Sequence, residues 1–281
     1  IINTMSAISK DDVLSLREKT GAGLIDCKRA LVESNGNLDD AVSILRKKGV
    51  ATAAKKAGRD AGEGIVAQSL SDDNSRGILV EINCETDFVA KNDDFVHFAS
   101  DVARQLLENP DTDLESQRTE QVAKIGENIR ISRSAILSVE SHGIVESYVH
   151  TGGKVAVLLS ISAGLSESSN SDKLKELAKD LCMHIAATSP VCVSRDEVPQ
   201  DLVEKETEIA KAQAEGKPPQ AIEKIVAGKL DKYFSNSCFL EQSFVKDPDQ
   251  TIKSLLLSIG KELGDEIKVE KFLRFQVGEE S

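Results

Sequence analysis

The sequence predicts an α+β fold in which helical units accompany antiparallel sheets, and three observations support this class. Apolar side chains recur at helical spacing over residues 9–49. A pattern of two apolar runs followed by a helix begins at Gly64 and again 79 positions later, at Gly143. Residues 201–234 are charged and helix-prone around a proline-containing break. The 281 residues, 40% of them hydrophobic, suffice for about two domains with a buried core.

Three short helices are expected within residues 9–49. Ser9 is placed to cap the first helix, which should end at Gly21. The second should cover residues 24–33, and the third should end near Gly49. These helices predict a small bundle.

A basic stretch follows in an otherwise acidic chain. Residues 46–59 carry six positive charges and no negative charge. Either these charges favour a helix C-terminus and then a solvated linker, or they contact an acidic partner.

The repeated pattern predicts two similar halves, each with a β-hairpin and a helix. Turn-rich segments join the two apolar runs of each half, which is typical of antiparallel pairing. Residues 114–131, between the halves, are expected to be helical. The predicted elements are runs at 64–66 and 77–83 with a helix to Leu107, then runs at 143–145 and 154–161 with a helix to Ala187.

A helical hairpin is expected at residues 201–234, broken at 216–219 by Gly-Lys-Pro-Pro. Its thin apolar stripe either packs on itself or pairs with another chain. The stripe consists of Leu202, Ile209, Ile222 and Val226. One more helix at 251–263 and a final strand at 272–277 complete the chain. The predicted division is 5–55, 60–142, 143–195 with 239–281, and 196–238 for the hairpin.

Composition argues against several function classes. The net charge of −12 disfavours nucleic acid as a direct partner, and 4% aromatic residues without tryptophan leave little for base stacking. No apolar stretch reaches the length of a membrane helix, and no secretory signal is visible. Five scattered cysteines predict buried thiols in a reducing compartment. The four histidines lie far apart and no phosphate-binding loop has the required spacing, so neither a metal nor a cofactor is expected.

One segment, residues 84–92, is a candidate site between a predicted strand and a predicted helix. Thr86 or Asp87 can cap the turn that follows. Phe88 then either folds into the core or serves as an aromatic anchor for a partner. Cys84 lies beside acidic residues, which should raise the pKa of its thiol and disfavour a nucleophilic role.

Five segments, distributed in order over nearly the whole chain from about Ala7 to Gly278, resemble the translation elongation factor Ts family. The two most specific are residues 20–31, Thr-Gly-Ala-Gly-Leu-Ile-Asp-Cys-Lys-Arg-Ala-Leu, and 83–91, Asn-Cys-Glu-Thr-Asp-Phe-Val-Ala-Lys. The others are 125–129, 183–187 and 272–278. Glu85 stands where glutamine is frequent in the family, and its extra charge beside Asp87 could weaken docking on an acidic surface.

The resemblance implies a guanine-nucleotide exchange factor for elongation factor Tu. Such a factor makes and breaks no chemical bond, so this protein is not expected to be an enzyme. It implies an N-terminal ubiquitin-associated-like domain, two related α+β core subdomains, and a protruding hairpin that serves as the oligomerisation element of a homodimer.

The resemblance also assigns roles to single residues, and the sequence leaves an alternative beside each. His184 would press on the phosphate loop of the partner, or be an ordinary helix residue with a satisfied ring. Leu24 and Ile25 would dock the N-terminal domain with the help of the Lys28 charge, or be core residues beside a solvated lysine. The residues expected near the partner's magnesium site are Thr86, Asp87, Phe88 and Val89.

Met5 is interpreted as the initiator, and the lack of a transit-type leader before it predicts a bacterial cytoplasmic protein. Two rival functions remain at this point. One is a binding module whose helical N-terminus recruits a different partner, such as a ubiquitin-like chain. The other is a thiol enzyme that uses Cys84.

Overall fold

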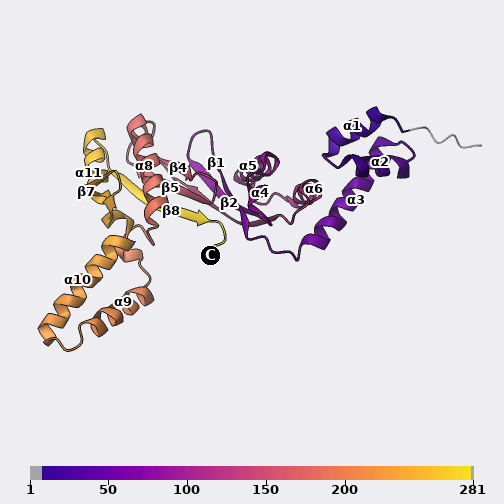
Figure 1. The fold of residues 1–281 in the computed structure, drawn as a ribbon. Helices are drawn as coiled ribbons and strands as arrows, with labels where there is room; N and C mark the ends of the chain where they lie inside the picture. The colour runs from indigo at the N-terminus through magenta and orange to yellow at the C-terminus, as the bar shows by residue number, and fades with distance from the viewer. Residues whose placement is uncertain (1–7, 280–281) are drawn as a thin grey trace, which may run out of the picture.

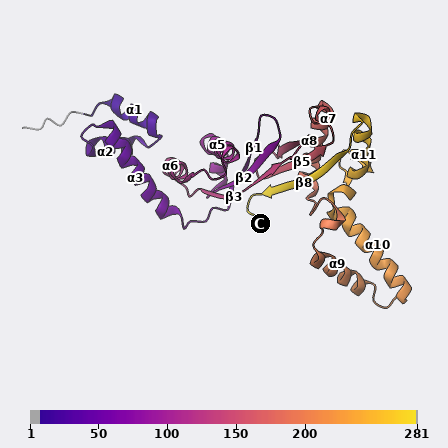
Figure 2. The same ribbon diagram turned by 180° about the vertical axis from the view of Figure 1, so that it is seen from behind.

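A computed structural model describes residues 8–279, and the predictions about Met5 and the start of the 5–55 unit lie outside them. The molecule is elongated (Figures 1 and 2). Three N-terminal helices lie at one end, a helical hairpin projects at the other, and two sheets with their helices lie between. The predicted α+β class and its two related sheet halves are confirmed. The predicted domain boundaries stay predictions.

The N-terminal unit consists of α1 (Lys10–Thr20), α2 (Leu24–Glu33) and α3 (Leu38–Lys56). Ser9 caps α1 in a reciprocal capping box with Asp12, and Gly21 ends it at φ 64°, a left-handed conformation that glycine adopts without strain. Small and apolar side chains form the core of the unit, namely Leu16, Cys27, Ala30, Leu31 and Ala41.

The prediction that the third helix ends near Gly49 is wrong, because α3 continues to Lys56. Gly49 is buried inside the helix, and a Cβ there would lie 3.5 Å from the Cβ of Ala123 on α6 (Glu115–Ile125). Gly49 therefore lies where α3 packs against α6 and does not end the helix.

Most of the basic stretch is therefore helix, not linker. Arg46 pairs with Glu120 at 3.7 Å, and Arg59 with Glu85 at 3.4 Å. Lys48 pairs with Asp26, and Lys56 donates to the carbonyl of Gly126. Four of the six charges therefore have partners inside this chain.

The two predicted hairpins are present. In the first sheet β1 (Glu63–Leu70) pairs with β2 (Arg76–Cys84), and in the second β4 (Gly143–Val149) pairs with β5 (Val155–Ala163). Each hairpin is followed by its predicted helix, α5 (Asp93–Glu108) after a single turn α4 (Asp87–Ala90), and α8 (Asp172–Thr188) after α7 (Ser166–Ser169).

Each sheet gains a third strand that the sequence analysis missed or placed too late. The segment 114–131 is helical only to Ile125, and β3 (Arg130–Ser138) joins the edge of β2. β8 (Ile267–Gln276) pairs with β5 and begins five residues before the expected start at 272. Both strands alternate polar and apolar residues, which gives a weak signal next to the buried runs of β2 and β5.

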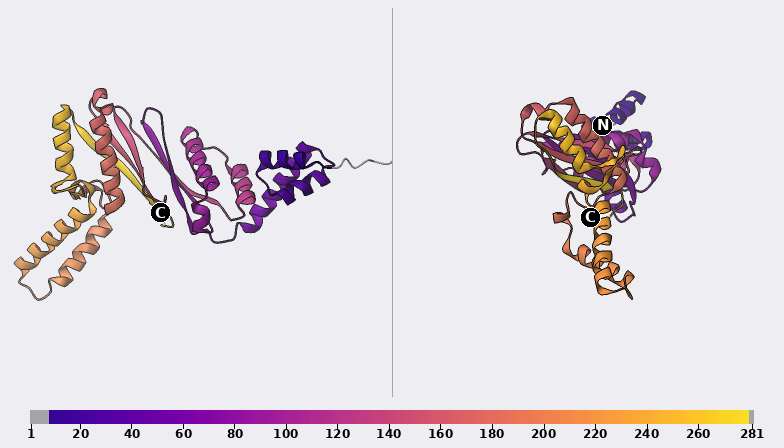
Figure 3. Two further views of the ribbon diagram at one scale, coloured as in Figure 1. Left: turned by 45° about the horizontal axis from the view of Figure 1, so that its top comes forward. Right: turned by 90° about the vertical axis from the view of Figure 1, so that its left-hand side faces the viewer.

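The two sheets pack against each other with helices outside (Figure 3). Along β2, Ile78, Val80 and Ile82 face α5, while Leu79 faces the second sheet. Burial on both faces explains why this strand is a continuous apolar run. The contact between the sheets is formed by Val66, Leu79, Leu137, Val145, Ala156, Leu158 and Phe275.

The remaining elements include the projecting pair α9 (Gln200–Gln213) and α10 (Pro219–Ser237), which confirms the predicted helical hairpin (Figure 1). The short strands β6 and β7 were not foreseen, whereas α11 begins directly after Thr251, its N-cap, as expected. The other bounds are η1 (Arg195–Glu197), η2 (Phe239–Glu241), β6 (Ser243–Phe244), β7 (Asp247–Thr251) and α11 (Ile252–Leu263). No helix between residues 8 and 279 combines the length and apolarity needed to cross a membrane.

Candidate functional site

The turn after β2 presents an aromatic ring to solvent. Thr86 is the N-cap of α4, with its Oγ1 accepting from the backbone N–H of Val89 at 3.4 Å, so Thr86 and not Asp87 forms the cap. Phe88 is 81% exposed, and the hypothesis that it folds into the core is wrong. Its neighbour Val89 points the other way and packs against the apolar core between the first sheet and α5.

Asp87 adds a carboxylate beside the exposed ring. Lys91 donates to it at 2.8 Å, and this hydrogen bond lowers the pKa of the carboxyl group, so it stays ionised near neutral pH. The side chain remains 47% exposed. The turn therefore combines a large apolar group and a negative charge on one accessible point.

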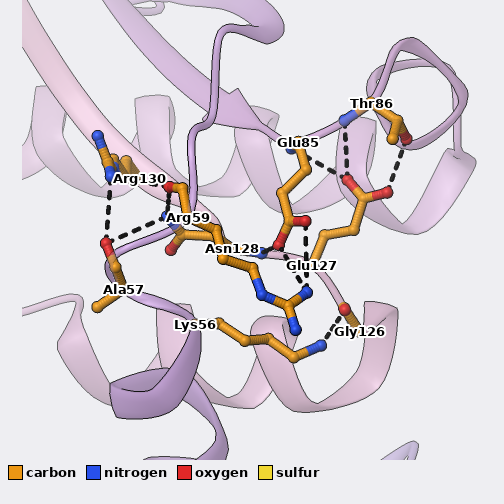
Figure 4. A network of polar contacts seen from close by, with 9 residues as sticks. All are labelled: Lys56, Ala57, Arg59, Glu85, Thr86, Gly126, Glu127, Asn128 and Arg130. Carbon is orange, nitrogen blue, oxygen red and sulfur yellow. Dashed lines mark hydrogen bonds and ion pairs between the residues drawn. The ribbon is translucent and has the colours of Figure 1, made fainter.

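Glu85 does not add a free charge there. Its carboxylate accepts from the backbone N–H of Asn128 at 2.6 Å and pairs with Arg59 at 3.4 Å (Figure 4). These contacts lower the pKa of Glu85, the Asn128 amide most and Arg59 next. The side chain is only 21% exposed, so its charge is directed into the protein.

Cys84 cannot act as a nucleophile in this structure. It is fully buried, and its thiol donates to the carbonyl of Thr86 at 3.2 Å. Burial, reinforced by the Glu127 carboxylate, raises its pKa to about 12. The predicted direction is right, but burial and not Glu85 or Asp87 is the main cause. Because the thiolate is the nucleophilic form, the raised pKa argues against the hypothesis of a thiol enzyme that uses Cys84.

The residues expected to dock the N-terminal domain lie together on one face of α2. Leu24 is 47% and Ile25 69% exposed, and Lys28 follows on the next turn, also exposed. The opposite face supplies Cys27 and Leu31 to the bundle core. The core alternative for Leu24 and Ile25 is therefore wrong.

His184 is fully buried on α8. Its Nδ1 accepts from the backbone N–H of Val245 at 3.3 Å, which places the proton on Nε2, where it is donated to Gln242 Oε1 at 2.8 Å. The ring meets Phe239 edge-on at 5.7 Å. Burial lowers its pKa. The structure therefore shows the satisfied ring of the alternative interpretation, and contact with a partner would require the segment after β6 to move.

These residues do not converge on one pocket. The face of α2, the turn at α4 and the helix α8 are spread along the molecule (Figure 1). Over residues 8–279 no group of three or more histidine, cysteine, aspartate or glutamate side chains is arranged to hold a metal ion. Phe88 on the α4 turn, and Leu24 with Ile25 on α2, are exposed apolar side chains beside charged groups, as in surfaces that bind another macromolecule, whereas His184 is buried.

Comparison with known proteins identifies the family. The family model for Elongation factor TS matches residues 85–279. Elongation factor Ts of Clostridium perfringens (strain SM101 / Type A) is 48% identical over 288 residues, covering 97% of this chain and 93% of that protein. Elongation factor Ts of Nautilia profundicola is 44% identical over 291 residues, covering 98% and 94%. The chain belongs to the elongation factor Ts family and is a translation elongation factor.

Proposed function

We propose that this protein is the guanine-nucleotide exchange factor of elongation factor Tu. It binds the GDP form of that GTPase and accelerates GDP release by disturbing the magnesium and phosphate site. It acts in the bacterial cytoplasm, where translation takes place. The observation that carries the proposal is the 81% exposed ring of Phe88 on a capped turn beside an ionised Asp87.

The physical basis is thermodynamic linkage. A GTPase holds GDP through backbone amides around the phosphates and through Mg²⁺. A factor that binds the nucleotide-free form more tightly weakens GDP binding by the same ratio. No covalent step is involved, because the binding energy of the complex alone drives the faster release of GDP.

Each site residue has a distinct part in this proposal. Phe88 inserts between partner helices and shifts them, while Asp87 disturbs the groups that orient the magnesium ion. Thr86 and Val89 hold the turn, one as cap and one as core contact. Leu24 and Ile25 supply apolar docking area at the far end, with Lys28 adding a charge. His184 is assigned to press on the phosphate loop of the partner, which requires the segment around Val245 to move aside.

The test is release of fluorescent GDP from purified elongation factor Tu. We expect acceleration by the wild type and a loss of about 30-fold or more for Phe88→Ala, the size of a hot-spot truncation of about 2 kcal/mol. Asp87→Ala should also be impaired. Leu257→Ala is the matched control, because Leu257 is 59% exposed on α11, in the other half. No acceleration by the wild type at micromolar concentration would overturn the proposal.

We also propose that the hairpin mediates a homodimer. It projects away from the sheets (Figure 2), and α10 has no buried residue, while Ile209 on α9 is 41% exposed. Sedimentation of the full chain should show a dimer that Ile209→Glu dissociates and Leu257→Glu does not. A monomeric wild type at tens of micromolar would contradict this assignment.

A further inference from the structure

The loop Gly126–Asn128 lies directly against the turn that carries Phe88 (Figure 4). It connects α6 to β3. Gly126 ends α6 in the left-handed region at φ 88°, so the chain reverses there, and the next two residues face the junction between β2 and α4. In the sequence these residues belong to one of the family segments, 125–129, and no role was predicted for them.

Glu127 binds the turn with both carboxylate oxygens. Oε2 accepts from the backbone N–H groups of Glu85 and Thr86, each at 3.0 Å. Oε1 accepts from the hydroxyl of Thr86 at 2.7 Å. Hydrogen bonds to an ionised acceptor are stronger than neutral ones. A helix of four residues has too few internal hydrogen bonds to hold its own geometry, so α4 depends on these outside contacts.

The loop is itself anchored on the opposite side. Asn128 is 1% exposed; its backbone N–H donates to Glu85, and its side-chain amide donates to the carbonyl of Arg59 at 2.9 Å. Lys56, the last residue of α3, donates to the carbonyl of Gly126. Because the loop is tied to the segment after α3, Glu127 is a fixed support for the turn.

We propose that Glu127 is a positioning residue that fixes Thr86 and thereby the direction in which Phe88 projects. This rests on the proposed exchange function. A wedge that shifts partner helices must be rigid, because a mobile turn can bind in other orientations without displacing anything. Loss of Glu127 therefore lowers the rate of GDP release within the complex more than it weakens formation of the complex.

The first test separates these two quantities. We expect Glu127→Ala to lower the maximal rate of GDP release about tenfold at saturating factor, since three charge-assisted hydrogen bonds are lost. Glu127→Gln should retain most of the rate, because its amide oxygen can accept from the same backbone N–H groups. Glu115→Ala removes the same charge at the other end of α6, where Glu115 is 61% exposed, and should behave as wild type.

A merely structural role predicts a different result. Partial unfolding would reduce the active fraction, which raises the half-saturating concentration and leaves the maximal rate unchanged. That outcome would overturn the proposal. In a double-mutant cycle, Glu127→Ala added to Phe88→Ala should cause little further loss, whereas a full additional loss would show that Glu127 does not act through Phe88.

A second test needs no partner. The chain has no tryptophan, so Phe88→Trp introduces a single reporter at the turn. Time-resolved fluorescence anisotropy should show a larger fast component when Glu127→Ala is added and no change with Glu115→Ala. An unchanged fast component would refute positioning by Glu127. Because this readout does not use nucleotide exchange, it distinguishes failure of the positioning role from failure of the proposed function.

Discussion

The imidazole of His184 is held from two sides by a backbone N–H donor and an amide acceptor. Thr188 Oγ1 shares the same acceptor, Gln242 Oε1, and Phe239 and Phe244 cover the ring. A neutral ring fits this arrangement, whereas a protonated ring would direct a second N–H at the backbone N–H of Val245. This conflict, together with burial, disfavours protonation in the folded state.

The resulting prediction concerns stability below neutral pH. The folded-state pKa of His184 is lowered from 6.5, so below about pH 6.5 the unfolded chain binds a proton at this site that the folded chain does not. The contribution is fully present above that pH and decreases as the pH falls through it. We expect the unfolding free energy, from urea denaturation, to fall between pH 7.5 and 5.5 more steeply for wild type than for His184→Gln. The exposed His142→Gln is the control, and equal slopes for wild type and His184→Gln would contradict the account.

At the level of elements, each of the two β-hairpins has a glycine with a positive φ at the start of its first strand. Gly64 is the second residue of β1 and Gly143 is the first residue of β4, with φ of 145° and 152°. A Cβ at either position would lie 2.2 Å from a backbone oxygen of the neighbouring strand, that of Ile82 or Ile161. The repeat seen in the sequence thus marks a shared close approach of two strands.

Replacing either glycine should therefore be costly. We expect Gly64→Ala and Gly143→Ala each to reduce the unfolding free energy by about 3 kcal/mol or more, through backbone strain and displacement of the neighbouring strand. Gly58→Ala is the control, because nothing lies within 4 Å of a Cβ there, and it should stay within about 0.5 kcal/mol. Urea denaturation followed by circular dichroism measures all three. A loss below about 1 kcal/mol at Gly64 would contradict this account.

At the scale of the whole molecule, an ion pair within the first sheet also contacts the C-terminal strand of the second sheet. Glu81 on β2 is 4% exposed and pairs with Arg133 on β3 at 2.7 Å. Arg133 also donates to the carbonyl of Gln276 and lies 4.3 Å from the ring centre of Phe275 on β8. The backbone N–H of Gly278 donates to Glu81 at 3.0 Å. The final family segment therefore fastens the second half to the first.

Breaking this pair should destabilise the whole molecule. Glu81→Ala leaves the guanidinium of Arg133, whose side chain is 20% exposed, without its carboxylate partner, and removal of one partner of a buried pair typically costs about 3–5 kcal/mol. Asp101→Ala removes the carboxylate of an exposed pair with Arg104 and should change stability by less than about 1 kcal/mol. Thermal and urea unfolding of both variants would measure the difference. A cost at Glu81 no larger than that at Asp101 would disprove the stabilising role of the Glu81–Arg133 pair.

Features that are set within a few residues, or by a repeated pattern, could be predicted from the sequence. Capping by Ser9, the turn glycine Gly21 and the helical spacing of apolar residues predicted the N-terminal helices. The buried runs of β2 and β5 predicted the hairpins, because such runs carry their signal locally. The candidate turn at Thr86–Val89 was found for the same reason, since a cap and an aromatic residue stand at a strand end.

Which alternative an ambiguous residue takes depends instead on contacts between distant segments. Phe88 and Val89 are adjacent and both apolar, yet one faces solvent and the other the core. Gly49 was expected to end a helix, but it lies inside α3, next to Ala123 of α6. Glu127 is 41 residues from Thr86 along the chain, so no local sequence pattern predicts the hydrogen bonds between them. Such contacts arise from the folding of distant segments onto each other, and that is where the support of the candidate site lies.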